Sequence, residues 1–222
     1  MCIINTSRRF VFVHVPKSAG TSICHALSPL TTAFDLEIGG TPYGEAFQEL
    51  VFERFRLHKH MRASELRDLL GPARWSDSFT FAFVRNPFSR AYSTYKYLKQ
   101  HRAELPFIDQ FDTFDEYVSS AEWDGHGPFR LLLPQSHWTH HRGEQLVDFI
   151  GRVETFTADL DHVLRMVGAG EAKAAPDVQN VSALPPSPPR LSEQAVAKIV
   201  DRYASDFAVF GYDPTVPTFE PV

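Results

Sequence analysis

The sequence predicts an α/β fold with a mainly parallel central sheet, and three observations support that prediction. Residues 10–15 and 79–84 are short apolar runs rich in β-branched and aromatic residues, as buried strands are. Each run is followed by apolar residues at helical spacing. A third apolar run, 146–150, precedes another helical segment. Strands that alternate with helices form mainly parallel sheets with helices packed on their faces.

Caps, turns and periodicity predict the remaining elements. Asn86 is expected to cap a helix that begins at Pro87, and the capping box Thr113-Phe-Asp-Glu116 opens another. Partial alternation in residues 55–60 indicates a short strand, and Cys2 is expected in a mobile N-terminus. The periodicity predicts helices at about 23–30, 43–52, 65–70, 87–101, 114–121, 157–166 and 192–207.

Length and composition limit the class of protein. The 222 residues fit a single domain spanning 1–222, and the net charge of −5 argues against a general binder of nucleic acid. Cys2 and Cys24 show no disulfide framework, so we expect two free thiols. No apolar run approaches the ~20 residues that span a bilayer. A cytoplasmic protein without a membrane segment is expected, unless the sequence is a trimmed fragment, and its oligomeric state is left open.

The stretch from Phe10 to Leu27 has the composition of an anion-binding site. Pro16 ends the predicted strand, and the small polar loop Lys17-Ser-Ala-Gly-Thr-Ser22 leads into a helix. The first amides of a helix and the positive end of its dipole attract anions, and Lys17 adds a full charge. The order differs from a Walker A motif, because the lysine precedes the only glycine. An ordinary strand–turn–helix connection is the alternative.

A second segment, Phe81-Ala-Phe-Val-Arg-Asn-Pro-Phe-Ser-Arg-Ala-Tyr-Ser93, places Arg85 at the end of a strand. Ligands of open α/β sheets bind at such ends. Arg90 and Ser93 are three residues apart on the following helix and can share a face, where a guanidinium and a hydroxyl suit a phosphate monoester. Alternatively, Arg85 pairs with a carboxylate and Ser93 is a solvated helix residue.

Together the two segments resemble the paired motifs of sulfotransferases that use 3′-phosphoadenylyl sulfate (PAPS). The likeness is nearest to the carbohydrate (heparan/chondroitin) 2-O-sulfotransferase-like branch and its small bacterial relatives. It implies a P-loop NTPase-like three-layer sandwich. It also implies that Lys17, Ser18, Ala19, Gly20, Thr21 and Ser22 hold the 5′-phosphosulfate side of PAPS, and that Arg85 and Ser93 hold its 3′-phosphate. Residues 133–137, 147–154 and 203–212 resemble further segments of these proteins.

Histidines supply candidates for the general base. His58 and His60 share a face if they lie on a strand, and an imidazole near its usual pKa suits proton transfer at neutral pH. The 2-O-sulfotransferases carry a similar H-x-H segment, which implies that His60 is the base and that His58 supports it or contacts substrate. Partly buried, hydrogen-bonded histidines are the alternative reading. His14 lies on the buried strand, and core packing is the favoured interpretation.

Two further regions are rich in polar and turn residues. Residues 123–142 predict a long functional loop, with His126, His137, His140 and His141 facing solvent or substrate rather than a metal. His137 is a candidate for the border of the acceptor pocket. Arg152 is a candidate for contact with cofactor or substrate, and Glu154 for a structural ion pair. The proline-rich residues 169–190 predict a loop or lid, in which we assign no site residue.

The sequence therefore predicts an enzyme that moves the sulfuryl group from PAPS to a hydroxyl, on a carbohydrate or a small glycosylated molecule, without a metal. Lys17 is expected to stabilise the leaving oxygen. One alternative is a P-loop kinase that uses ATP and magnesium, although Asp148 is its only weak magnesium candidate. The other is a non-catalytic nucleotide-binding protein of the same fold.

Overall fold

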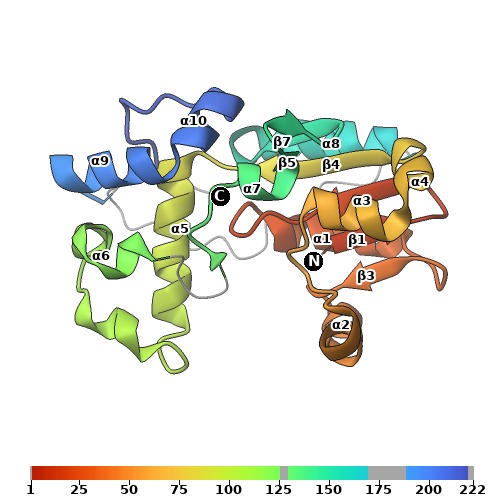
Figure 1. The fold of residues 1–222 in the computed structure, drawn as a ribbon, viewed down its shortest axis with the longest axis horizontal. Helices are drawn as coiled ribbons and strands as arrows, with labels where there is room; N and C mark the ends of the chain where they lie inside the picture. Colours follow the sequence, from red (N-terminus) through yellow and green to blue (C-terminus); the bar gives the residue numbers. More distant parts are fainter. Residues whose placement is uncertain (1, 126–129, 170–188, 220–222) are drawn as a thin grey trace. The chain divides into compact units, whose positions relative to one another are not determined.

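The computed structural model describes residues 2–125, 130–169 and 189–219. The chain divides into two compact units, which are described separately (Figure 1). The sheet unit comprises residues 1–84 and 137–180, and the helical unit comprises residues 85–136 and 181–222. The single domain expected over 1–222 stays a prediction.

The sheet unit is built on a five-stranded sheet with the order β3-β1-β2-β4-β7. Strands β2, β4 and β7 pair in parallel, whereas β1 is antiparallel to both β2 and β3. Four of the five strands therefore run the same way, which confirms the predicted α/β class with a mainly parallel sheet. The strands are β1 (Cys2–Asn5), β2 (Phe10–Val13), β3 (Leu36–Ile38), β4 (Phe79–Val84) and β7 (Phe149–Arg152).

Helices α1 (Gly20–Leu27) and α8 (Phe156–Met166) pack on one face of this sheet. Alternate residues of the strands, such as Phe10, Phe12 and Phe81, share a core cluster with the apolar faces of both helices. The unit also contains η1 (Ser28–Leu30), α2 (Pro42–Phe55), α3 (Ala63–Leu70), α4 (Pro72–Ser76), the hairpin β5 (His140–His141) and β6 (Glu144–Gln145), and η5 (Val153–Thr155). Helix α7 (Ser136–Thr139) begins where the chain re-enters the sheet unit.

The helical unit is organised around α5 (Pro87–Gln100), in which every residue from Pro87 to Tyr95 is buried. The side chain of Asn86 accepts hydrogen bonds from the amides of Phe88 and Ser89, so it caps α5 as predicted. Aromatic and aliphatic side chains of the other helices complete the core around α5. Those elements are η2 (Pro106–Gln110), α6 (Phe114–Ser119), η3 (Glu122–Asp124), α9 (Glu193–Arg202) and α10 (Ala204–Phe210).

Several predictions about local structure are wrong. Cys2 is a fully buried residue of β1 rather than part of a mobile terminus, because β1 pairs on both edges. Residues 55–60 form no strand, since α2 extends to Phe55 and a turn follows. The third predicted strand at 146–150 begins three residues later, at Phe149, and the last helix breaks at Tyr203. Cys2 and Cys24 are free thiols, as expected.

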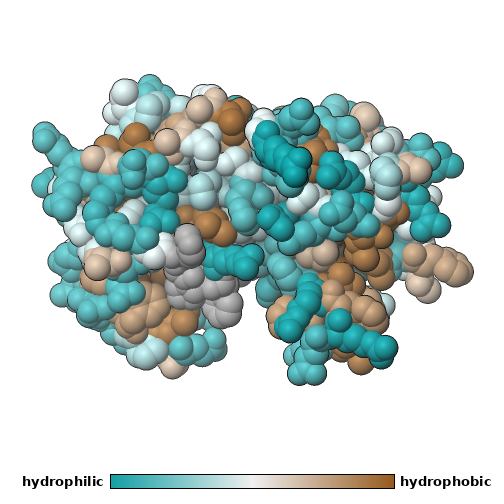
Figure 2. All heavy atoms as spheres, viewed as in Figure 1, coloured by the Kyte–Doolittle hydropathy of each residue, from teal (hydrophilic) through white to brown (hydrophobic). Residues whose placement is uncertain are grey.

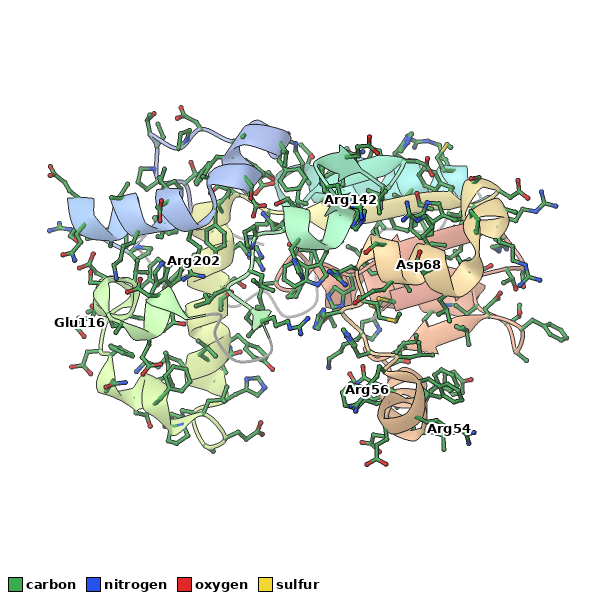
Figure 3. The ribbon with its side chains drawn as sticks, in the orientation of Figure 1. Arg54, Arg56, Asp68, Glu116, Arg142 and Arg202 are labelled. Carbon is green, nitrogen blue, oxygen red and sulfur yellow. The ribbon has the colours of Figure 1, made fainter. Side chains whose placement is uncertain are left out.

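Helix α2 carries an exposed apolar surface, visible as brown spheres below β3 in Figure 2. Tyr43, Leu50 and Phe55 are exposed, and Phe52 is 42% exposed. The guanidinium groups of Arg54 and Arg56 lie over the rings of Phe55 and Phe52, at the end of the helix (Figure 3). Along the parts of the chain that the structure describes, none of the helices is both long and apolar enough to cross a bilayer.

Candidate active site

The loop between β2 and α1 contains two residues with an unusual backbone conformation. Lys17 and Ala19 both adopt left-handed conformations, with φ of 65° and 58°, although neither is glycine. Such conformations cost free energy, and they are concentrated at functional sites. Left-handed residues that alternate with right-handed ones turn successive amides toward one point. Ala19 is also the N-cap of α1, so the loop leads directly into the positive end of this helix.

The remaining loop candidates lie in the first turn of α1. Gly20 and Ser22 are buried, as is Ser18 in the loop, while Thr21 is half-buried. Within the described residues the Thr21 hydroxyl makes no hydrogen bond, so it is available to a ligand. The structure thus brings all six predicted loop residues, 17–22, to one strand–helix junction.

The segment that carries His58 and His60 is a turn fixed by contacts from two elements, α2 and β1. The Lys59 amide donates to Oε1 of Gln48 at 2.7 Å, and its ammonium pairs with Glu45 at 2.9 Å. Buried Cys2 donates to the carbonyl oxygen of Lys59 at 3.2 Å. These long-range bonds replace the strand pairing that the sequence suggested. Consequently the two histidines do not stand on one strand face.

His60 is held in one orientation and in one tautomer. Its Nδ1 lies 3.2 Å from the carbonyl oxygen of His14. Since a carbonyl only accepts, Nδ1 carries the proton and Nε2 has the free lone pair. The His60 carbonyl accepts a bond from Nε1 of Trp138 at 3.1 Å, and its amide approaches Nδ1 of His58 at 3.3 Å. The ring is therefore arranged to accept a proton at Nε2.

Burial changes the protonation of two histidines at this place. Removal from water lowers the pKa of His60 well below its usual range, and it does the same to the pKa of His14. Nearby positive charge, from Lys59 for both and from Lys17 for His14, acts in the same direction. Both imidazoles are therefore neutral at pH 7, which is the form that a general base requires.

His14 contacts the site instead of only filling the core. Its ring centroid lies 4.5 Å from that of His60 and 5.9 Å from that of Phe12. The sequence favoured core packing because His14 follows a buried strand. The alternation of side chains along a strand, Phe10-Val-Phe-Val-His14, was the available signal that His14 points to the same face as Phe12 and α1.

In the helical unit Arg85 is held through its backbone by Gln135. Oε1 of Gln135 accepts from the Arg85 amide, and Nε2 donates to the Arg85 carbonyl, both at 2.8 Å. The fully buried carboxylate of Asp206 accepts in turn from the amides of Gln135, at 2.7 Å, and Ser136, at 2.9 Å. Sequence reasoning named neither residue, although both lie in segments that it had marked as informative.

Ser93 and Lys96 lie one turn apart on α5, on the face that the sequence attributed to Ser93 and Arg90. The Ser93 hydroxyl makes no hydrogen bond to any described residue. Partial burial lowers the pKa of Lys96, and the charge of Arg85 lowers it further. The ammonium of Lys96 lies 5.1 Å from the centre of the Tyr92 ring. An ammonium and a guanidinium that act on one another are groups that suit a phosphate. The spacing Ser93-x-x-Lys96 was a signal for this residue that the sequence reading did not use.

The suggestion that Arg90 joins Ser93 at a phosphate is wrong. Arg90 is fully buried, and its Nη1 and Nη2 donate to the carbonyl oxygens of Leu133 and Leu131, each at 3.0 Å. Its guanidinium also lies 5.6 Å from the centre of the Tyr203 ring. Arg90 thus fastens the chain around residues 131–133 to α5.

A family model described as "Sulfotransferase family" matches residues 1–213. The chain belongs to the sulfotransferase family. This membership supports sulfotransfer as its activity in general terms. Neither the comparison with curated proteins nor the comparison with solved structures gave a match.

Other residues marked in this sulfotransferase sequence have varied surroundings. Asp148 precedes β7, and its carboxylate accepts from both the amide and the hydroxyl of Thr80 at 2.8 Å. Half-buried Arg152 ends β7, and its amide donates to Asp159. Among the residues that the structure describes, no three His, Cys, Asp or Glu side chains could hold one metal ion. His126 and residues 170–188 lie outside the described residues.

Proposed function

We propose that this member of the sulfotransferase family transfers the sulfuryl group of PAPS to the hydroxyl of a carbohydrate or small glycosylated acceptor. The observation that carries the proposal is the contact of His14 with both His60, the proposed base, and Gly20, a residue of the proposed phosphate-binding loop. His14 links them, because its ring contacts His60 at 4.5 Å between centroids and its imidazole lies against Gly20 of α1. A cytoplasmic location remains an expectation from the sequence.

The roles of the residues follow from their chemistry. Residues 17–22 hold the 5′-phosphosulfate side of PAPS, which supplies an activated sulfuryl group when bound. Nε2 of His60 takes the proton of the acceptor hydroxyl while the hydroxyl oxygen forms its bond to sulfur. Lys17 stabilises the negative charge on the phosphate oxygen as its bond to sulfur breaks. His58 supports His60, with its Nδ1 3.3 Å from the His60 amide.

Arg85 and Ser93 hold the 3′-phosphate in this proposal. The observations that support these two roles all concern residues of the helical unit. Gln135 fixes the Arg85 backbone, and the Ser93 hydroxyl is available within the described residues. A guanidinium and a hydroxyl form charge-assisted hydrogen bonds with a phosphate monoester.

The kinase alternative requires magnesium at the carboxylate of Asp148. In the structure this carboxylate accepts hydrogen bonds from Thr80. The amide and the hydroxyl of Thr80 both donate to Oδ2 of Asp148, and Asp148 stands at the amino end of β7. Nucleotides of open α/β sheets bind at the carboxyl ends of the strands. This position argues for the sulfotransferase and against the kinase.

Thermal unfolding with three ligands separates the possibilities. A ligand at 100 times its dissociation constant stabilises by about 2.7 kcal/mol, which raises Tm by roughly 5–10 °C for a chain of this size. We expect that shift with adenosine 3′,5′-bisphosphate and a smaller one with ATP, unchanged by magnesium. A larger shift with ATP and magnesium would refute the proposal.

Turnover of labelled PAPS with a panel of sugars and glycosides then distinguishes an enzyme from a non-catalytic binder. His60→Ala should lower kcat by about 10²–10⁴, as loss of a general base does. Lys17→Ala should lower kcat by about 10²–10³, as loss of a group that stabilises developing charge does. Binding of the bisphosphate with no transfer to any acceptor, in a folded protein, would favour the non-catalytic alternative.

A further inference from the structure

His14 occupies the space between the proposed base and the start of α1. Its ring stacks on Phe12 at 5.9 Å with an interplanar angle of 26°, and it lies 4.5 Å from the ring of His60. Its own carbonyl oxygen is the partner of Nδ1 of His60. One residue therefore contacts His60 through both backbone and side chain.

The imidazole of His14 also explains why residue 20 is glycine. A Cβ atom at Gly20 would lie 1.8 Å from Nε2 of His14, 2.3 Å from Cδ2 and 2.7 Å from Cε1. Gly20 is helical, and it is not among the residues with positive φ. A side chain at residue 20 would therefore displace the ring, whereas the backbone conformation of Gly20 would accept one.

We propose that His14 is a positioning residue for the sulfuryl transfer: its ring, wedged against Gly20 and His60, fixes the distance of the base from the phosphate-binding helix. The inference rests on the proposed function of His60 and the loop. It adds a physical link between the two, because any ring movement that α1 imposes on His14 is passed to His60.

The ring of His14 has a second consequence, for the protonation of His60. It occupies space that water would otherwise fill, and desolvation is the largest cause of the lowered pKa of His60. The ionisable side chains that act on the pair are His58 and Lys59 on the turn, and Lys17 on the loop. These charges remain when His14 is replaced, whereas the desolvation is relieved. The pKa of His60 should therefore rise toward its ordinary value in a variant without the ring.

A double-mutant cycle tests the link between α1 and the base. Gly20→Ala alone should lower kcat by at least tenfold, because the new methyl group displaces the His14 ring. His14→Ala should lower kcat by 10–100-fold and leave the KM for PAPS within about threefold. In the His14→Ala background, Gly20→Ala should cost no more than a further twofold. Equal losses from Gly20→Ala in both backgrounds would overturn the proposal.

The pH profile separates positioning from simple stabilisation of the fold. The acidic limb of kcat/KM should move to higher pH in His14→Ala, and it should stay low in His14→Phe, which keeps an aromatic ring. His101→Ala is the matched control, because His101 also contacts a ring, that of Tyr97 at 4.1 Å, and a carbonyl oxygen at 2.9 Å. That control should change neither kcat nor the limb. If His14→Ala is folded and the acidic limb of its kcat/KM profile does not move, the positioning role of His14 is refuted.

A measurement without substrate keeps the inference separate from the proposed function. The pKa of the His60 imidazole can be followed by NMR in the wild type, His14→Ala and His14→Phe. A higher pKa of His60 in His14→Ala, but not in His14→Phe, supports the proposed arrangement even if PAPS is not the donor. No rise contradicts it even if the enzyme proves to be active with PAPS.

Discussion

Replacement of Gln135 by methionine tests how the helical unit positions Arg85. Methionine has a similar length but can neither donate to the Arg85 carbonyl nor accept from its amide, so two hydrogen bonds of 2.8 Å are lost. Each contributes about 1 kcal/mol, and a buried group left without a partner costs about 1–3 kcal/mol. Because two such groups are left, we expect the free energy of unfolding to fall by about 2–6 kcal/mol. Since domains have about 5–15 kcal/mol, the variant should fold.

The consequence for ligand binding should be confined to the 3′-phosphate. If Arg85 moves away, one charge-assisted hydrogen bond worth about 1.5–3 kcal/mol is lost, which weakens binding about 10–150-fold. Calorimetric titration should show this loss for adenosine 3′,5′-bisphosphate and almost none for adenosine 5′-monophosphate, which lacks the 3′-phosphate.

Gln110→Met is the matched control for this experiment. Gln110 is an exposed residue of the same unit, and its Nε2 donates to the carbonyl of Phe107. The control should alter neither affinity. The reasoning fails if Gln135→Met weakens both nucleotides equally, or if it weakens neither while the protein is destabilised as calculated.

Four further substitutions give distinct results. Ser93→Ala should weaken adenosine 3′,5′-bisphosphate about tenfold, with the monophosphate unaffected, by calorimetry. Lys96→Met should weaken the bisphosphate too, and it should abolish the proton uptake expected on binding at alkaline pH, because the pKa of Lys96 is lowered in the free protein and a phosphate raises it again. Arg90→Met should lower the free energy of unfolding by about 3–6 kcal/mol in urea, since two carbonyls lose a charged donor. Asp148→Asn should cost about 1–3 kcal/mol of stability and leave sulfotransfer unchanged, whereas loss of transfer would revive a role for Asp148 in the site.

Local chemistry was sufficient to predict the elements that border the site. The run 79–84 forms β4 with the predicted limits, and Asn86-Pro87 starts α5 as expected. In both places the signal is contained in a few neighbouring residues, an apolar run or a cap followed by proline. The loop 17–22 is a candidate for the same reason, because a lysine, hydroxyls and one glycine stand together between a strand and a helix.

Long-range contacts decide what the sequence could not show. Residues 58–61 have no regular structure of their own, and bonds to Cys2, Gln48 and Trp138 fix the turn. The Cys2 bond spans 57 positions of the chain. Strand β1 was missed similarly, since four residues next to the terminus become a strand only when β2 and β3 pair with them. Periodicity contains no information on such partners.

Arg90 and Lys96 show that residues at the same spacing from Ser93 can have different surroundings and therefore different roles. Each stands three residues from Ser93, so helical geometry alone favours neither. The guanidinium of Arg90 donates to carbonyls 41 and 43 residues further along the chain. The ammonium of Lys96 instead lies 5.1 Å from the centre of the Tyr92 ring, and the charge of Arg85 acts on it. A planar fork matches two fixed carbonyls, and a flexible ammonium adapts to a ligand that comes and goes. Arg90 is therefore unsuited to a phosphate, and the titrations of Lys96→Met described above test whether Lys96 contributes to binding it.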